Sequence, residues 1–579
     1  MHIDVVKNRG SRPTVLLRET RREGKTIRKR TLANLSSLPA NQIAMIRRVL
    51  NGEELGSADG EIEIIRSQHH GHADAVATAM GRLGFAKLID PKKSRQRDLV
   101  VAMVTARLIA PEASKLGMTW VWSNTTLADD LGVADASEDE LYAAMDWLIE
   151  RQGKIEKRLA KRHLQAGGLV LLDLTSSSFE GTKCPLAKIG YSRDGKPGTL
   201  QVNYGILTDA RGCPVSVSVF EGNTGDPKTL LPQVEKVRSE FGIARLVMVG
   251  DRGMISNVQI DVMRKMDGVD WITALKTGAI RSLVDNGALQ LGLFDEKNIV
   301  AIIHGDFPGE QLVARRNPEL AKRRAIKRRE LLAATTYKLE KIKDRVANGR
   351  LAGRDKIGEQ VGKVIGKYKV EKHFNRKIED NSFSFSVDEE NVAAEAALDG
   401  IYVIRTSVSK EEMAAEAAVL NYKKSAEVER AFRTSCRRRA SGTMKGVDLH
   451  VRPIRHRLDG RVKAHIFLSM LAYYVQWHMA EAWKSLTFTD EAPSDEARER
   501  DPVAPARRSA AALAKVHNRR LTDGSPAMSF AQLLAHMATV VCNTCRHKSE
   551  KSGTAIFKLT TLPNAKQQQA LDLLATITV

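Results

Sequence analysis

Cysteine is scarce in this chain, with five among 579 residues. So low a number excludes a disulfide scaffold and is typical of a protein of the reducing cytoplasm. No basic stretch followed by an apolar one opens the sequence, so we expect no secretory signal. The most apolar helix candidate, residues 464–475, is too short and too interrupted to span a bilayer. We therefore expect a cytoplasmic protein with no membrane partner.

Acidic residues are outnumbered by basic ones. The chain has 91 lysines and arginines against 69 aspartates and glutamates, a formal net charge of +22. A basic surface that only keeps the protein soluble is one explanation, and a polyanionic partner is another. An excess of this size favours nucleic acid, since phosphate contacts supply most non-specific affinity, and hence association with the nucleoid. Charge alone does not separate DNA from RNA or from a ribosome-associated role.

The periodicity of apolar residues divides the chain into regions. Residues 14–17 and 26–28 flank a turn at Gly24 and predict a basic hairpin. Helical spacing then runs from about 73 to 163, and Ser137 with Glu140 forms a capping box for the helix over 138–163. This mostly helical N-terminal domain is suited to binding DNA or to pairing subunits, and the sequence does not decide between them.

A strand-like period begins at residue 168. Three strands in succession, then alternating helix and strand, predict an α/β fold with an RNase H-like catalytic core, in which the first and fourth strands are neighbours. A large insertion subdomain interrupts the core before a strand at 400–405 and a helix at 463–477. The expected core elements are strands 169–174, 201–208, 214–220, 245–250 and 271–275 and helices 227–240 and 255–266.

Six regions follow from these patterns. They are the basic hairpin region 1–65, the helical domain 66–165, the first part of the core 166–276, the insertion subdomain 277–398, the second part of the core 399–485, and a linker with a helical tail 486–579.

Three acids stand out by their positions. Asp173 interrupts an apolar run, Asp251 ends another, and Glu429 lies on an amphipathic helix predicted over 421–435. A carboxylate at a buried strand end is costly unless a metal or a partner compensates its charge. Carboxylate oxygens suit Mg²⁺, for which Mn²⁺ is a possible substitute. Two such ions about 4 Å apart can support both cutting and joining of phosphodiesters.

Several stretches in order along the chain carry a resemblance to a known family. They are LLDLTSSSFEG (171–181), GYSRDGKPGTLQVNYGIL (190–207), VFEGNTGDPKTL (219–230), VGDRGMIS (249–256), LDGIYVIRTSV (398–408), YKKSAEVERAFRT (422–434) and DLHVRPIRHRLDGRVKAHIFLSMLAYYV (448–475). Together they resemble bacterial insertion-sequence transposases of the DDE type, in the group with a Tyr-Arg-Glu-Lys signature and a large insertion before the catalytic glutamate.

This resemblance implies roles for individual residues. Asp173, Asp251 and Glu429 match the metal-binding catalytic acids, and Tyr422 matches the signature tyrosine, a DNA contact. The implied partners are double-stranded DNA, as terminal inverted repeats and target, and a second copy of the chain in a synaptic homodimer.

The chain departs from the family signature on both sides of Glu429. Ser425 stands at the arginine position and Cys436 at the lysine position. Residues 436–444 look like an insertion, after which Lys445 is a candidate for the displaced lysine and a DNA contact. Arg252, Arg430 and Arg433 are further DNA-binding candidates, although the last two have glutamates at helical spacing with which they can pair.

Three hypotheses follow. The first is a DNA transposase that binds terminal inverted repeats, cleaves DNA ends and transfers the 3′ ends. The second is a catalytically impaired relative that acts only as a DNA-binding protein. The third is a metal-dependent nuclease of the same fold. Cys542, Cys545 and His547 echo half of a zinc site, but their spacing favours packing on a helix in the core.

Overall fold

A computed structural model describes most of the chain. The described residues are 1–8, 13–24, 26–52, 62–292, 294, 298–432, 449, 451–491, 508–547 and 556–579. The chain divides into two compact units, each treated by itself below. The smaller comprises Met1–Gln68 with Val541–Thr561, and the larger His69–Val540 with Leu562–Val579.

The smaller unit begins with an antiparallel sheet of β1 (His2–Val6), β2 (Thr14–Glu23) and β3 (Thr26–Asn34), followed by helix α1 (Ala40–Leu50). The predicted hairpin is confirmed, since β2 and β3 pair and Gly24 lies between them at a φ of +64°. Glycine adopts that left-handed conformation without the steric cost of a Cβ.

A second sheet in the smaller unit has the order β17 (Phe557–Thr560), β16 (Val541–His547), β4 (Ile62–His69). The predicted helical packing of Cys542 and Cys545 is therefore wrong, although both are buried. The run from Thr539 to Thr544 is rich in β-branched residues, which favour strands, and pairing with β17 outweighs the helical spacing.

The helical region confirms most of the expected helices. The predicted helix over 138–163 is two, α7 (Glu138–Ile149) and α8 (Gln152–His163). The Ser137–Glu140 capping box is present. The other helices are α2 (Gly71–Arg82), α3 (Phe85–Ile89), α4 (Arg95–Ile109), α5 (Lys115–Ser123) and α6 (Leu127–Leu131).

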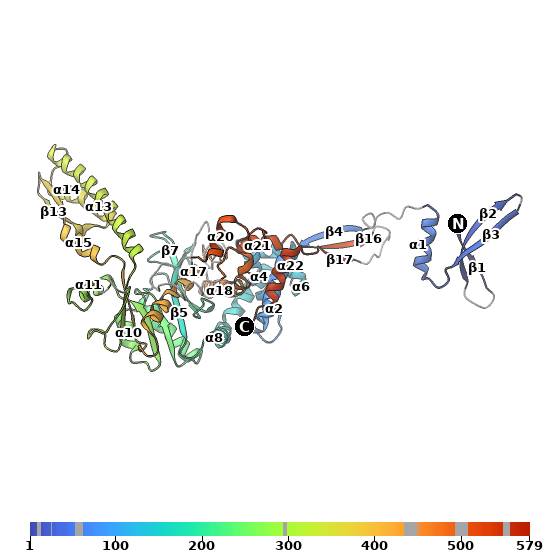
Figure 1. Ribbon diagram of the computed structural model, residues 1–579, viewed down its shortest axis with the longest axis horizontal. Coiled ribbons are helices and arrows are strands. Elements are labelled where there is room, and N and C mark those ends of the chain that lie inside the picture. Colours follow the sequence, from blue (N-terminus) through green and yellow to red (C-terminus); the bar gives the residue numbers. More distant parts are fainter. Residues whose placement is uncertain are drawn as a thin grey trace. The chain divides into compact units, whose positions relative to one another are not determined.

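Within the described residues, the larger unit holds a nine-stranded mixed sheet (Figure 1). Six of its strands were predicted, and five of them lie in the order β8-β7-β5-β9-β10. β5 and β9, the first and fourth, are parallel neighbours as expected, and β10 continues parallel to β9. β7 and β8 are antiparallel additions beyond β5. Their bounds are β5 (Leu169–Ser178), β7 (Leu200–Thr208), β8 (Pro214–Glu221), β9 (Leu246–Val249) and β10 (Val269–Ala274), and β6 (Lys188–Ile189) also pairs with β7.

The sheet continues past β10 with three antiparallel strands. β15 (Ile401–Thr406) pairs with β10, β12 (Gln311–Arg316) with β15, and β11 (Ile299–Ile302) with β12. Two of these strands come from the segment predicted as an insertion subdomain. That segment therefore contributes directly to the main sheet.

The rest of the segment forms a core of its own. Helices α13 (Pro318–Ala347) and α14 (Arg354–Tyr368) lie side by side (Figure 1). They pack with the hairpin of β13 (Phe374–Ile378) and β14 (Phe383–Val387). The first half of α13 is polar, and five exposed basic residues lie on it: Lys322, Arg323, Arg324, Lys327 and Arg329.

Helix α18 (Asp459–Ala482) unites the helical region with the sheet. It packs on α4, α7 and β8, and its apolar side chains are buried along most of its length. Because it has protein on nearly every side, its high hydrophobicity reflects burial in the core. No helix in the described part of the chain is both long and apolar enough to cross a membrane.

Candidate active site

Asp173 lies within strand β5. The strand was predicted to end at 174, but it extends to Ser178, so Asp173 is an interior residue of the strand. Its neighbours on both sides are buried while its own side chain is half-buried. The Leu174 backbone N–H donates to Asp173 Oδ1 across 2.8 Å and holds the carboxylate in place.

Asp251 follows the carboxyl end of strand β9. Leu171 and Val249 are paired in parallel register, so the residues two positions further on, Asp173 and Asp251, leave neighbouring strands at the same level. Asp251 is exposed, and its Oδ1 accepts from the N–H groups of Gly253 at 2.9 Å and Met254 at 2.8 Å. Both bonds are accepted by Oδ1.

Glu429 lies on α17 (Ser425–Phe432), which packs against β5. Val428 and Phe432 are buried beneath this helix, and the Phe432 ring meets the edge of Tyr204 at 5.8 Å between centroids. Glu429 is on the exposed side. The single helix predicted over 421–435 is broken, because Lys424 separates α17 from α16 (Ala415–Lys423).

The three acids share one electrostatic environment. Burial, followed by the charges of Glu429 and Asp251, raises the pKa of Asp173 to about 7 against the opposing hydrogen bond from Leu174. Carboxylates gathered in this way repel one another unless a cation lies between them. The donor set is made of oxygens from three separate elements, which is the ligand type that Mg²⁺ and Mn²⁺ prefer. The residues present therefore fit a divalent cation.

Arg193 is a neighbour that the sequence reasoning did not single out. Its charge lowers the pKa of Asp173, its guanidinium pairs with Asp226, and its backbone N–H donates to Ser176 Oγ at 2.9 Å. Asp226 precedes α9 (Pro227–Glu235) but makes no side-chain cap bond, and its carboxylate pairs with Arg193. The sequence did contain one indication of Arg193, because it lies in GYSRDG, at the start of one of the stretches that carry the family resemblance.

Tyr422 lies at the end of α16, where its Oη accepts a hydrogen bond from Tyr402 Oη at 2.7 Å. Burial raises the pKa of Tyr422 above its usual value, and Tyr402 and Asp251 act in the same direction. The tyrosine is therefore within electrostatic reach of Asp251. Tyr402 lies on β15, and the Arg315 guanidinium is 5.2 Å from its ring centre. Nothing in the sequence selected Tyr402, because a tyrosine in a strand is usually a packing residue.

The remaining candidates are less defined. Arg252 is exposed directly after Asp251. Arg430 belongs to α17, but its side chain lies outside what the structure describes, as do Arg433, Cys436, the 436–444 segment and Lys445. Asp209 lies in a turn, where its Oδ1 accepts from the N–H groups of Arg211 and Cys213.

Two family models match the chain. One, described as the IS1634 family transposase N-terminal domain, matches residues 3–61, and the other, described as the transposase DDE domain, matches residues 165–474. No curated protein matches.

Two solved structures show a distant likeness. The piggyBac transposase synaptic complex with hairpin DNA is 8% identical, with 70% of this chain and 72% of that chain covered and a TM-score of 0.32. The Mos1 transposase paired-end complex with left transposon end is 15% identical, with 33% and 62% covered and a TM-score of 0.13.

Proposed function

Because the chain belongs to the family of DDE transposases, we propose that it binds the terminal inverted repeats of an insertion sequence, cleaves the DNA there and transfers the 3′ ends to target DNA. The observation that carries this proposal is that Asp173, Asp251 and Glu429 lie close together. The charges of Asp251 and Glu429 add to the effect of burial in raising the pKa of Asp173.

The strand order supports an RNase H-like core for this activity. Three antiparallel strands, β8-β7-β5, continue through the parallel strands β9 and β10. We assign β5, β7, β8, β9 and β10 as strands one to five of such a core. The segment between β10 and β15 is then the insertion, which returns two strands to the sheet.

The three acids act together in the proposed mechanism. Asp173 and Asp251, on adjacent parallel strands, would hold the divalent cations together with Glu429, which faces them from helix α17. Bound Mg²⁺ or Mn²⁺ would lower the pKa of an attacking water or 3′-hydroxyl and stabilise the leaving oxygen. The hydrogen bonds to Asp173 Oδ1 and Asp251 Oδ1 orient both carboxylates before DNA arrives.

The DNA contacts that we propose begin beside the acids. Arg252, Arg430, Arg433 and Tyr422 are near Asp251 or Glu429 in the sequence or in space, and Lys445 follows them along the chain. The exposed basic residues of α13 supply further phosphate contacts, in line with the net charge of +22. Synapsis of two ends would require a homodimer.

The test uses a labelled DNA end taken from the flank of the gene, with Mg²⁺ or Mn²⁺ supplied. Cleaved and joined products are expected from the unmutated protein. They should vanish with chelator and in Asp251→Asn, and persist in the matched control Asp285→Asn, an exposed carboxylate on α11 (Thr277–Asp285).

A deletion of residues 436–444 separates the other hypotheses. Product from the deletion variant alone would identify the natural chain as an impaired, DNA-binding relative. Cleaved but never joined product would identify a nuclease. Bound ends without product from either protein would contradict catalysis altogether.

A further inference from the structure

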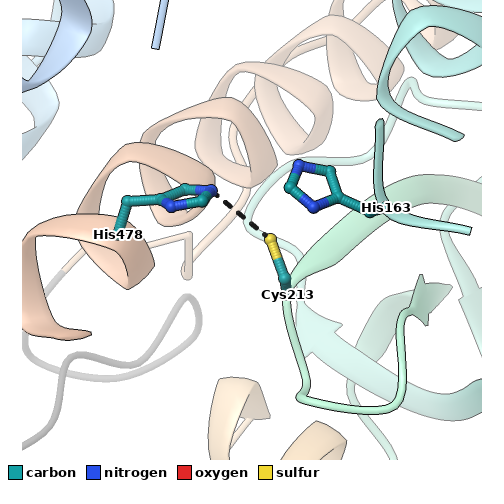
Figure 2. Close-up of side chains that lie close together, drawn as sticks. All are labelled: His163, Cys213 and His478. Atoms are coloured by element: carbon teal, nitrogen blue, oxygen red, sulfur yellow. Dashed lines mark hydrogen bonds between the residues drawn. The ribbon is translucent and has the colours of Figure 1, made fainter. Parts of the chain in front are cut away.

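A cysteine and two histidines meet away from the acids. His163 is the last residue of α8, Cys213 directly precedes β8, and His478 lies near the end of α18. Their ligand atoms all lie within 4.8 Å of one another, with 3.7 Å between Cys213 Sγ and His478 Nε2. Figure 2 shows the two imidazoles on either side of the sulfur.

One of these distances is close to that between two donors of a tetrahedral metal site. Zinc binds sulfur at about 2.3 Å and nitrogen at about 2.0–2.1 Å, so a bound sulfur and nitrogen are about 3.5 Å apart. The measured separation of 3.7 Å between Cys213 and His478 is close to that value. The other donor atoms, which lie within 4.8 Å of one another, would have to draw closer on binding.

The position of Cys213 is fixed by its turn. Asp209 Oδ1 accepts from the Cys213 N–H at 3.0 Å, and the Asp209 N–H donates to the Cys213 carbonyl at 3.1 Å. The cysteine is fully buried, and burial raises the pKa of its thiol, whose proton a bound metal would displace. Burial lowers the pKa of His163 to about 4 and that of His478 to about 3. A neutral imidazole has the free lone pair that a metal requires.

The surroundings of His163 also suit a ligand. Its Nε2 lies 3.1 Å from Tyr474 Oη, which leaves Nδ1 for a metal and provides the outer hydrogen bond that orients ligating histidines. Arg211 Nη2 lies 3.3 Å from Nδ1 and would have to withdraw. Its side chain is 62% exposed and already paired with Asp209, so it can move into solvent.

We propose that His163, Cys213 and His478 form a binding site for a thiophilic divalent cation, with Zn²⁺ as the preferred ion. An open cleft of about 700 Å³ borders both histidines and gives water access to a fourth coordination position. Sulfur and imidazole donors select zinc over magnesium, so the site differs in chemistry from the cluster of acids. It does not depend on the proposed transposition.

The proposed ion would join three parts of the larger unit. α8 belongs to the helical region, Cys213 to the connection between β7 and β8, and α18 to the core between them. A ligand that binds only the folded state stabilises it, so zinc would resist separation of these parts.

The first experiment uses the full-length protein, treated with chelator and titrated with Co²⁺ in excess Mg²⁺. A thiolate-to-cobalt charge-transfer band at one equivalent is expected. It should disappear in Cys213→Ser and His478→Gln and remain in the matched control Cys184→Ser, which replaces another buried cysteine. No band from the unmutated protein, or an equal band from Cys213→Ser, overturns the proposal.

A second measurement needs no variant. X-ray absorption of the unmutated protein loaded with one equivalent of Zn²⁺ should show one sulfur neighbour at about 2.3 Å and nitrogen neighbours at about 2.0 Å. A shell of oxygen alone would place the zinc at carboxylates and overturn the proposal even if Cys213→Ser does not fold.

Discussion

Tyr402 on β15 donates its phenolic hydrogen to Tyr422 Oη on α16 across 2.7 Å. The bond joins a strand that was expected in the second part of the core to the signature tyrosine of the resemblance. Their rings are also tilted against each other, with 5.6 Å between centroids.

A double-mutant cycle measures this pair. Tyr402→Phe and Tyr422→Phe should each lower the free energy of unfolding by about 1 kcal/mol, because each removes one hydrogen bond and leaves its partner's hydroxyl in a half-buried place. The double variant should lose less than the sum, as for residues in direct contact. Denaturant unfolding is the measurement, with the exposed Tyr337→Phe as control. Strict additivity would contradict the bond.

The raised pKa of Asp173 predicts a pH-dependent cost to stability without metal. In the unfolded chain the carboxyl ionises near its ordinary value of 3.8, whereas in the folded protein its pKa is about 7. Between these values the folded state binds more protons, so its stability falls as pH rises and levels off above 7.

Asp173→Asn removes this titration. In chelator, the variant should exceed the unmutated protein in unfolding free energy by on the order of 2 kcal/mol at pH 8, and the gap should close towards pH 4. Thermal unfolding across pH measures it. Added Mn²⁺ should narrow the gap at pH 8 by stabilising the unmutated protein. Curves that run parallel from pH 4 to 8 would contradict the raised pKa of Asp173.

Buried Glu310 should be among the residues most sensitive to substitution. Its carboxylate receives two hydrogen bonds from Arg405, at 2.5 and 2.6 Å, and one from Arg264 at 2.8 Å. Glu310→Gln leaves buried positive charge uncompensated and should cost about 3 kcal/mol by denaturant unfolding.

The control for Glu310 is Glu359→Gln, which breaks an exposed pair with Lys363 on α14. Exposed pairs contribute little, so its unfolding midpoint should stay nearly unchanged. Equal losses of stability in Glu310→Gln and Glu359→Gln would show that burial of an ion pair does not determine the effect of breaking it.

Gly400 and Gly287 form a matched pair for a steric test. Their φ values are +77° and +76°, so alanine strains the backbone equally at both. A Cβ at Gly400 would lie 2.4 Å from the Asn317 carbonyl oxygen, whereas nothing lies within 4 Å at Gly287. Gly400→Ala should therefore be the less stable variant by about 1–3 kcal/mol in thermal unfolding. Similar losses of stability in the two variants would mean that the backbone at the start of β15 shifts to make room for the added Cβ.

The sequence predicted the elements of the central sheet well, because strands buried on both faces carry unbroken apolar runs. Leu169–Leu172 and Leu246–Val249 are such runs, and the parallel pairing of β5 with β9 followed from their order. Boundaries were less accurate. The residues Thr175–Ser178 are polar, so the apolar pattern does not predict that β5 continues through them. They belong to β5 because they pair with β7.

Pairing between distant segments escaped prediction. β11 and β12 are short, and only their alignment beside β15 gives them a place in the sheet. The same holds for the side chains around the acids. Arg193 and Tyr402 are ordinary residues in their own stretches, and they become neighbours of Asp173 and Tyr422 only through the fold.

The sheet β17-β16-β4 has a consequence for synthesis of the protein. β4 leaves the ribosome early, but its neighbour β16 begins only at Val541. At about 5–20 residues per second, translation of the chain between them takes roughly 25–95 s. During that time β4 presents an open edge to other nascent chains. A ribosome that stops before Val541 therefore releases a chain in which β4 lacks β16, its neighbour in the described sheet.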